Sequence, residues 1–315
     1  MNSSKFAFFF LFLSSIVLFS CNIETAKAPK NKQIIILSDY LTQSDTSLFL
    51  SFLHEENVSM QIVQMQADKI IGLIRNEGAN IHADVIMVKT MSDVHKMSKR
   101  SLLQRINFSK NLTQEQGRYA SWLYDFVGYG IDPFIVASTP KRKVRIYNDL
   151  LESKFVNELN EKETISMLSP IMNKLKKVDA NKWVKKFSDS SVSKSMLLDS
   201  LNRNFPVLTL YSDFSSNKDT LLDYSNRYLR YPNSKSTGSF FNLRTIAIIN
   251  QAQNYSVAKD FIFYCLDEKN NRSINKSLNT FPIYSSKEVF RKYSVSQEKL
   301  VEYNQIIARL LKKVN

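Results

Sequence analysis

The chain has 315 residues, of which 43% are hydrophobic, enough to bury a substantial core in two lobes or domains. Only six glycines and seven prolines occur, which excludes a fibrous or disordered chain. The formal charge is +14, but the basic residues are spread along the sequence, and the densest run is at residues 141–145. Nucleic-acid binding is therefore not expected, because it requires a clustered basic surface.

The first twenty residues have the form of an export signal. Lys5 supplies a positive charge, and residues 6–19 form an apolar run that is too short for a comfortable bilayer span. The run ends at Ser20 and Cys21 in a pattern that resembles the bacterial lipobox, which implies cleavage before Cys21 and its lipidation. Residues 21–32 are then expected to tether the folded part to a membrane of the cell envelope, facing the periplasm or the cell surface. The alternative is an uncleaved membrane anchor with an incidental cysteine.

The next part of the chain alternates between two hydrophobic periods. Apolar or alternating runs predict strands at residues 33–37, 58–63 and 83–88. Helical spacing predicts helices at residues 44–53, 68–76 and 90–97, the second of which ends at Gly78. This alternation predicts an α/β fold with mostly parallel sheets and helices on both faces. Ligands bind such sheets at the carboxyl ends of strands, so the loops at residues 38–44 and 89–93 are candidate binding loops.

The rest of the chain predicts further strands and a clear final helix. Strands are expected at residues 134–137, 207–211 and 244–249, and helices through much of 149–203, at 219–228 and at 257–266. Cys265 in the last of these helices is expected to be a buried, unreactive thiol. The final helix has an apolar face of Leu300, Tyr303, Ile307, Leu310 and Val314. This face is short for a coiled coil, so it is expected to pack on the body of the protein.

Several segments, taken in order, resemble the ferric-iron type of periplasmic solute-binding protein, which serves ABC transporters. The strongest match is LIRNEGANIHADV at residues 73–85, where that family has a helix ending Glu-Gly-Ala/Asn-Asn and then Ala-Asp-Val. The other matches are residues 52–63, Tyr-Pro-Asn at 231–233 with residues 237–242, the helix at 258–266, and the aromatic-Pro-Ile element at 281–283. The chain thus resembles a divergent member of this family.

The resemblance implies the type II periplasmic binding fold, in which two α/β lobes hold a ligand in the cleft between them. Lobe 1 would comprise residues 33–130 and 240–290, and lobe 2 would comprise residues 131–239. The C-terminal helix at residues 296–313 would pack on the body. The connections between the lobes would fall near residues 129–132 and 238–242.

The resemblance also implies a set of metal ligands. Tyr211 stands at the first position of the family's tyrosine pair, and Ser212 replaces the second. Tyr40, in the loop after the first strand, is the other candidate metal ligand. The family's other central tyrosine falls close to Ile131, and Tyr129 lies two residues away. Phenolate oxygens are hard ligands of the kind that Fe³⁺ favours.

Lys89 and Thr90 stand after the third strand, where the family often has an acidic ligand. A lysine there would repel a trivalent cation, whereas a positive charge near a helix N-terminus favours an anion. The ligand is therefore expected to be iron(III), a related metal or an anionic chelate. The candidate ligand-binding residues are Tyr40, Lys89, Thr90, Tyr129 and Ser212, and the candidate metal ligands are Tyr211 and Tyr40.

These features predict a monomeric, lipid-anchored binding protein that delivers a small solute to an ABC permease and ATPase. An enzyme is not expected, because the sequence has no GxSxG, HExxH, P-loop or GxGxxG motif, and His54, His82 and His95 are isolated. No cofactor is expected, apart from Fe³⁺ as the transported ligand. The alternative is a lipoprotein derived from the same fold that binds no ligand and serves as a scaffold or binds a partner protein.

Overall fold

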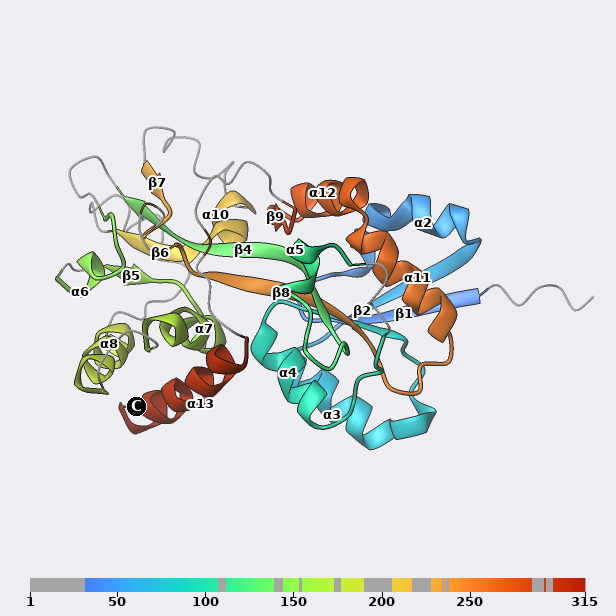
Figure 1. Ribbon diagram of the computed structural model, residues 1–315, viewed down its shortest axis with the longest axis horizontal. Coiled ribbons are helices and arrows are strands. Elements are labelled where there is room, and N and C mark those ends of the chain that lie inside the picture. The colour runs from blue at the N-terminus through green and yellow to red at the C-terminus, as the bar shows by residue number, and fades with distance from the viewer. Residues whose placement is uncertain are drawn as a thin grey trace, which may run out of the picture.

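The computed structural model describes residues 32–106, 112–138, 144–152, 155–172, 177–189, 206–216, 228–233, 235, 238–284, 292 and 297–314 (Figure 1). Cys21 and the expected signal sequence lie outside the described residues, as do residues 219–227 of the helix expected at 219–228. Among the described helices, none combines the length and the apolar character needed to cross a membrane.

The predicted alternation of strands and helices in the first part of the chain is confirmed. The strands are β1 (Lys32–Ser38), β2 (Val58–Gln64) and β3 (Val85–Val88). The helical elements are η1 (Gln43–Phe49), α2 (Leu50–Glu55), α3 (Ala67–Glu77), η2 (Gly78–Asn80) and α4 (Met91–Lys99), of which η1 and η2 are 3₁₀ helices. β2 buries alternate residues, whereas β3 is buried throughout, because apolar clusters cover both of its faces.

The strands form one sheet with the order β2-β1-β3-β8-β4-β6-β5, and β7 and β9 also pair with β4. The remaining strands are β4 (Val127–Ser138), β5 (Val156–Asn157), β6 (Val207–Leu210), β7 (Tyr228–Arg230), β8 (Phe241–Ile248) and β9 (Phe281–Pro282). The α/β class is confirmed, but the pairing is mixed rather than mostly parallel. Among the described strands, only β1–β2, β1–β3 and β5–β6 are parallel. The chain leaves the first half along β4 and returns along β8, so these two strands must be antiparallel.

β4 and β8 run between two halves of the molecule, each with its own hydrophobic core (Figure 1). Residues 127–133 of β4 pair with β8, and residues 134–137 pair with β6. Ile34 and Phe261 belong to the main core of the first half, and Trp183 belongs to the core of the second half. The chain is therefore a two-lobed α/β protein.

The other helices cover the two halves of the sheet. The second half carries α6 (Asp149–Glu152), α7 (Glu161–Met172), α8 (Lys177–Asp189) and α10 (Tyr211–Ser216), and the first half carries α5 (Gln114–Gly117), α11 (Tyr255–Leu266) and α12 (Glu268–Ser277). The C-terminal helix α13 (Gln297–Val314) packs against α7 and α8 through buried Ile307 and Leu311 (Figure 1). Cys265 is fully buried on α11, and this burial raises the pKa of its thiol.

Two glycines of the α3 region form a matched pair for a stability test. Gly78 follows the helix with φ 51° and ψ −121°, a conformation that favours glycine, whereas a Cβ added to Gly72 within the helix would meet no atom within 4 Å. Gly78→Ala is expected to lower the free energy of unfolding by about 1–3 kcal/mol. Gly72→Ala is expected to raise it by about 0.5–1 kcal/mol. Urea denaturation measures both effects, and a stabilising Gly78→Ala substitution would contradict the strained helix end.

Candidate functional site

The carboxyl ends of strands from both halves point towards the same stretch of β4. Val88, at the end of β3, and Gly128 of β4 pair with the same residue of the intervening strand β8, Thr245. From the opposite side, Leu210 at the end of β6 pairs with Phe134. The segments that follow these strands therefore converge on residues 129–133 of β4 and the neighbouring part of β8. Since ligands of α/β proteins bind at the carboxyl ends of strands, we treat this region as the candidate site and call it the crossing site.

A buried ion pair lies at the centre of the crossing site. Arg244 Nη2 on β8 donates to Asp132 Oδ2 on β4 at 3.3 Å, and both side chains are at most 5% exposed. The same carboxyl group accepts the Ser212 backbone N–H at 3.0 Å and the Ser212 hydroxyl at 2.6 Å. Burial raises the pKa of Asp132, whereas Arg244 and Ser212 lower it. The Arg244 guanidinium, the Ser212 backbone N–H and the Ser212 hydroxyl all donate hydrogen bonds to this carboxyl group. These contacts therefore favour the carboxylate form of Asp132.

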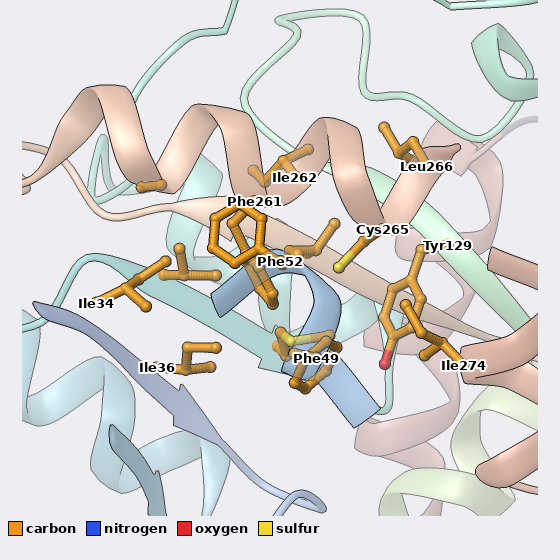
Figure 2. Packing of buried hydrophobic residues seen from close by; sticks show 14 of the residues in the cluster. Ile34, Ile36, Phe49, Phe52, Tyr129, Phe261, Ile262, Cys265, Leu266 and Ile274 are labelled. Carbon is orange, nitrogen blue, oxygen red and sulfur yellow. The ribbon is translucent and has the colours of Figure 1, made fainter. Parts of the chain in front are cut away.

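Two predicted ligand residues, Tyr40 and Tyr129, lie close to Arg244. The guanidinium carbon is 4.7 Å from the centre of the Tyr40 ring. Tyr129 is fully buried, and its hydroxyl is visible in Figure 2. Burial raises the pKa of the Tyr129 hydroxyl far above its ordinary value, although the nearby charge of Arg244 lowers it. Two phenol groups and one guanidinium group therefore share the crossing site.

A β-bulge and helix α12 fix the backbone of Tyr129. The register between β4 and β8 shifts between Gly128 and Gly130. The Tyr129 carbonyl accepts hydrogen bonds from the side-chain amides of Asn271 at 2.8 Å and Asn275 at 2.9 Å. A Cβ on Gly130 would collide with the Asn275 side chain, so this close approach requires glycine. The position of Tyr129 therefore depends on contacts with a distant helix.

Asp39 connects the loops that follow β1 and β3. Its carboxyl group accepts the Lys89 backbone N–H at 2.9 Å, which places Lys89 beside the end of β1. Thr90 is the N-cap of α4, and its hydroxyl donates to the buried Asp93 carboxylate at 2.8 Å. The Thr90 hydroxyl is thus engaged by the side chain of Asp93 in the first turn of α4, and it accepts no capping hydrogen bond from the helix backbone.

Asp39 is expected to make the stability of the fold depend on pH. Burial raises its pKa to about 6 and Asp93 adds to the increase, while the Lys89 hydrogen bond and the charges of Lys89 and Lys162 oppose it. A carboxyl group whose pKa is higher in the folded state than in the unfolded state lowers the free energy of unfolding at pH values above the folded-state pKa. This loss of stability disappears at pH values below the unfolded-state pKa of about 4. Asp39→Asn, which can still accept the Lys89 hydrogen bond, should therefore melt at a higher temperature than the unaltered chain at pH values above about 7. Melting curves recorded across this range provide the measurement, and a difference that does not change with pH would contradict the expectation.

A further ionic cluster ties the two halves together beside the loop that follows β3. Lys162 of α7 lies 2.9 Å from Asp68 Oδ2 on α3 and 3.2 Å from Asp93 Oδ1 on α4. Lys96 also lies 3.3 Å from Asp93, whose side chain is 1% exposed. A helix of the second half therefore contacts two helices of the first half through charged side chains.

Tyr211 begins α10 rather than ending the preceding strand as predicted. The helix starts here because Asp132 accepts the Ser212 backbone N–H, one of the donors that a first helical turn leaves unpaired. The Tyr211 ring packs on Phe281 with 4.8 Å between ring centres, and it lies 6.5 Å from the Tyr231 ring. Since Phe281 belongs to β9, which pairs with β4, this aromatic cluster borders the crossing site.

The structure brings most of the predicted site residues into one region. Tyr40 and Tyr129 lie beside Arg244, and Ser212 contacts the same ion pair through Asp132. Lys89 lies beside Asp39, and Thr90 is the N-cap residue of α4. Tyr211 lies at the border of the site. The connecting residues Asp39, Asp132 and Arg244 were not predicted. A signal existed for the last two, because Asp132 interrupts an apolar run and Arg244 lies within a predicted strand, and charged residues are rarely buried unless they are paired. Among the described residues, no group of three or more His, Cys, Asp and Glu side chains could hold a metal ion.

The fold is that of the two-lobed periplasmic binding proteins, and the similar solved structures include several ferric-binding proteins. A Trichodesmium protein (IdiA, FutA) in complex with iron and citrate ligands aligns with a TM-score of 0.76 at 16% identity, over 90% of this chain and 99% of that chain. The ferric binding protein from Campylobacter jejuni gives the same values. Iron-bound HitA from Pseudomonas aeruginosa aligns with a TM-score of 0.74 at 14% identity, over the same shares of the two chains. No protein-family model matches the sequence, and no curated protein matches it. The resemblance seen in the sequence is therefore confirmed at the level of the fold.

Proposed function

We propose that this chain is the lipid-anchored solute-binding protein of an ABC importer, and that it captures its solute at the crossing site. Lobe 1 would comprise residues 33–130 and 240–290, and lobe 2 would comprise residues 131–239. The observation that carries this proposal is the convergence of strand ends from both halves on one stretch of β4, where buried polar side chains gather. This arrangement suits ligand capture, because ligands of α/β sheets bind where strands end.

The solute that we propose is iron(III), a related metal or an anionic metal chelate. The ferric-binding proteins of the same fold support iron, and one of them is described with citrate as well. In this chain, Tyr40, Tyr129 and Tyr211 offer phenol oxygens in or beside the crossing site, and such oxygens suit a hard cation. Lys89 and Arg244 introduce positive charge that a chelate with negative groups would accommodate.

We further propose that Cys21 carries the lipid and that an ABC permease and its ATPase receive the solute. The support for lipidation is the sequence pattern that ends at Cys21. The fold suits a carrier that acts as a monomer, since one chain supplies both halves of the crossing site. The three solved structures described above are iron-bound or ferric-binding proteins, which favours transport over catalysis.

The proposal is tested by native mass spectrometry of the full-length chain, purified from the membrane fraction without chelators. A bound mass equal to iron or an iron chelate is expected, and its removal should lower the melting temperature, because a ligand stabilises the fold that binds it. A chain that carries no solute, and whose melting temperature does not respond to ferric citrate, citrate or phosphate, would favour the scaffold alternative. The same spectra would reveal whether Cys21 is lipidated.

A further inference from the structure

Two exposed aromatic side chains lie on one short turn of the first half, residues 121–126, which we call the aromatic turn. Trp122 is 70% exposed, the largest value among the exposed large hydrophobic residues of the described chain, and Tyr124 is 47% exposed. Tryptophan is usually well buried, because its ring carries a large apolar surface. Two such rings, two positions apart and both open to solvent, therefore indicate a surface that meets a partner.

The backbone of the aromatic turn is held in a strained conformation. Tyr124 has φ 54°, which is rare for a bulky residue and persists only where the surroundings enforce it. The Tyr124 carbonyl accepts the Ile106 backbone N–H at 2.8 Å. Next to it, the buried Asp125 carboxylate accepts hydrogen bonds from the hydroxyl groups of Ser98 and Ser121. The turn is thus a fixed platform for the two exposed rings.

The charge around the aromatic turn is positive. The hydrogen bonds from Ser98 and Ile106 place residues 98–106 beside the turn. This neighbouring segment exposes Lys99, Arg100 and Arg105. Asp125 is the only acidic residue of the two segments, and it is 4% exposed. Basic side chains beside tryptophan and tyrosine are the chemistry that proteins present to the interface of an anionic lipid bilayer.

The aromatic turn lies at the end of the sheet where β1 begins. Leu103, in the segment beside the turn, forms a β-bridge with Ile249, the residue after β8. The Ile249 N–H donates to the Asp84 carbonyl, and the Asp84 N–H donates to the Ile35 carbonyl in the first part of β1. The carboxyl ends of β1 and β3, at the crossing site, lie at the opposite end of these strands. The turn therefore shares an end of the first half with the start of the folded chain.

The tether keeps this end of the molecule near the lipid. Ten residues, 22–31, separate Cys21 from the start of β1 at Lys32. Even when fully extended, they span at most about 35 Å. A surface at the same end as Lys32 therefore meets the bilayer at a high effective concentration, so that weak contacts suffice to hold it there.

We propose that the aromatic turn, together with Lys99, Arg100 and Arg105, docks the first half on the surface of an anionic bilayer. This inference rests on the proposed function in one respect, the membrane anchor at the N-terminus. Trp122 and Tyr124 enter the headgroup region, and the basic side chains contact lipid phosphates. Docking by this end leaves the crossing site, at the other end of the strands, turned away from the lipid.

Tryptophan fluorescence of the full-length chain, reconstituted into vesicles through its N-terminus, tests the proposal. The chain has two tryptophans, and Trp183 is 1% exposed, so Trp122 reports on the turn. The vesicles contain phosphatidylcholine with brominated acyl chains, which quench tryptophan on contact, with or without phosphatidylglycerol. In the anionic vesicles, Trp122 emission is expected to shift to the blue and to be quenched, and both effects should weaken in high salt. Trp122→Phe should leave a Trp183 signal that does not respond.

Charge variants test whether the basic side chains contribute. Arg100→Gln/Arg105→Gln should lower the ratio of docked to undocked chains roughly 10–30-fold, as expected for two basic residues at an anionic surface. Lys269→Gln/Lys276→Gln is the matched control, because it removes the same charge from exposed positions on α12 and should leave the quenching unchanged. All four side chains are exposed, so both variants are expected to fold.

Two results would overturn the proposal. One is Trp122 emission that brominated lipid does not quench, and a blue shift without quenching would assign the turn to a protein partner or a second copy of the chain. The other is an equal loss of quenching in the two double variants. Either result leaves solute capture at the crossing site intact. Conversely, a chain that carries no solute can still dock, and an uncleaved N-terminal anchor would hold the chain on the vesicle as a lipidated Cys21 does.

Discussion

Asp132→Ala is expected to lower the free energy of unfolding by about 3–5 kcal/mol, because it leaves the Arg244 guanidinium buried without its counter-charge. Arg244 is 4% exposed, so the guanidinium has little access to water. The substitution also removes the acceptor for both donors of Ser212, including the backbone N–H at the start of α10. Denaturant unfolding followed by circular dichroism measures the change.

The double variant Asp132→Ala/Arg244→Met separates the charge effect from the loss of packing. Replacing both members of a buried ion pair by uncharged groups is often nearly neutral, so the double variant should regain most of the stability that Asp132→Ala loses. If the effects of Asp132→Ala and Arg244→Met on the free energy of unfolding are instead additive, the ion pair does not account for the stability of the crossing site.

Phe261→Ala is expected to lower the free energy of unfolding by about 3–5 kcal/mol, since it opens a cavity in the core of the first half. Figure 2 shows Phe261 of α11 facing the cluster that includes Phe52 and Ile34. Its ring is fully buried and meets those of Phe49 and Phe52 edge to face, at 5.0 Å and 5.2 Å between ring centres. Thermal and denaturant unfolding of the variant provide the measurement.

Phe263→Ala is the matched control, because this phenylalanine lies on the same helix but is only partly buried. Phe263→Ala should lower the free energy of unfolding by less than half as much as Phe261→Ala, since it removes less apolar surface from the core. Equal losses for the two variants would show that α11 does not present Phe261 to the core as described.

The sequence was sufficient to predict the alternating strands and helices of residues 33–97. The strand at residues 58–63 could be predicted because its buried side chains alternate. The end of α3 could be predicted because Gly78 supplies a backbone conformation that other residues avoid. These signals are local, so they do not depend on what the chain does elsewhere. The ordered motif matches then pointed to the two-lobed fold.

The mixed pairing of the sheet and the centre of the crossing site depend on contacts between distant residues. β8 pairs antiparallel with both β3 and β4, and nothing in the local composition of β8 determines that these pairs are antiparallel. Arg244 and Asp132 are 112 positions apart in the chain. Each is visible in the sequence as a charged residue in or beside a predicted strand, but only the register of β4 and β8 shows that they meet. The start of α10 at Tyr211 likewise depends on Asp132, a residue of another strand.

The proposed function requires one solute to contact both halves of the molecule at the crossing site. Hydrogen–deuterium exchange of the full-length chain, with and without ferric citrate, tests this claim directly, because a bound solute slows exchange in the segments that it holds. Slower exchange is expected together at residues 38–41, 127–132, 210–216 and 241–246, which come from both halves. Binding of ferric citrate that protects segments of one half alone, or segments remote from β4 and β8, would contradict the account.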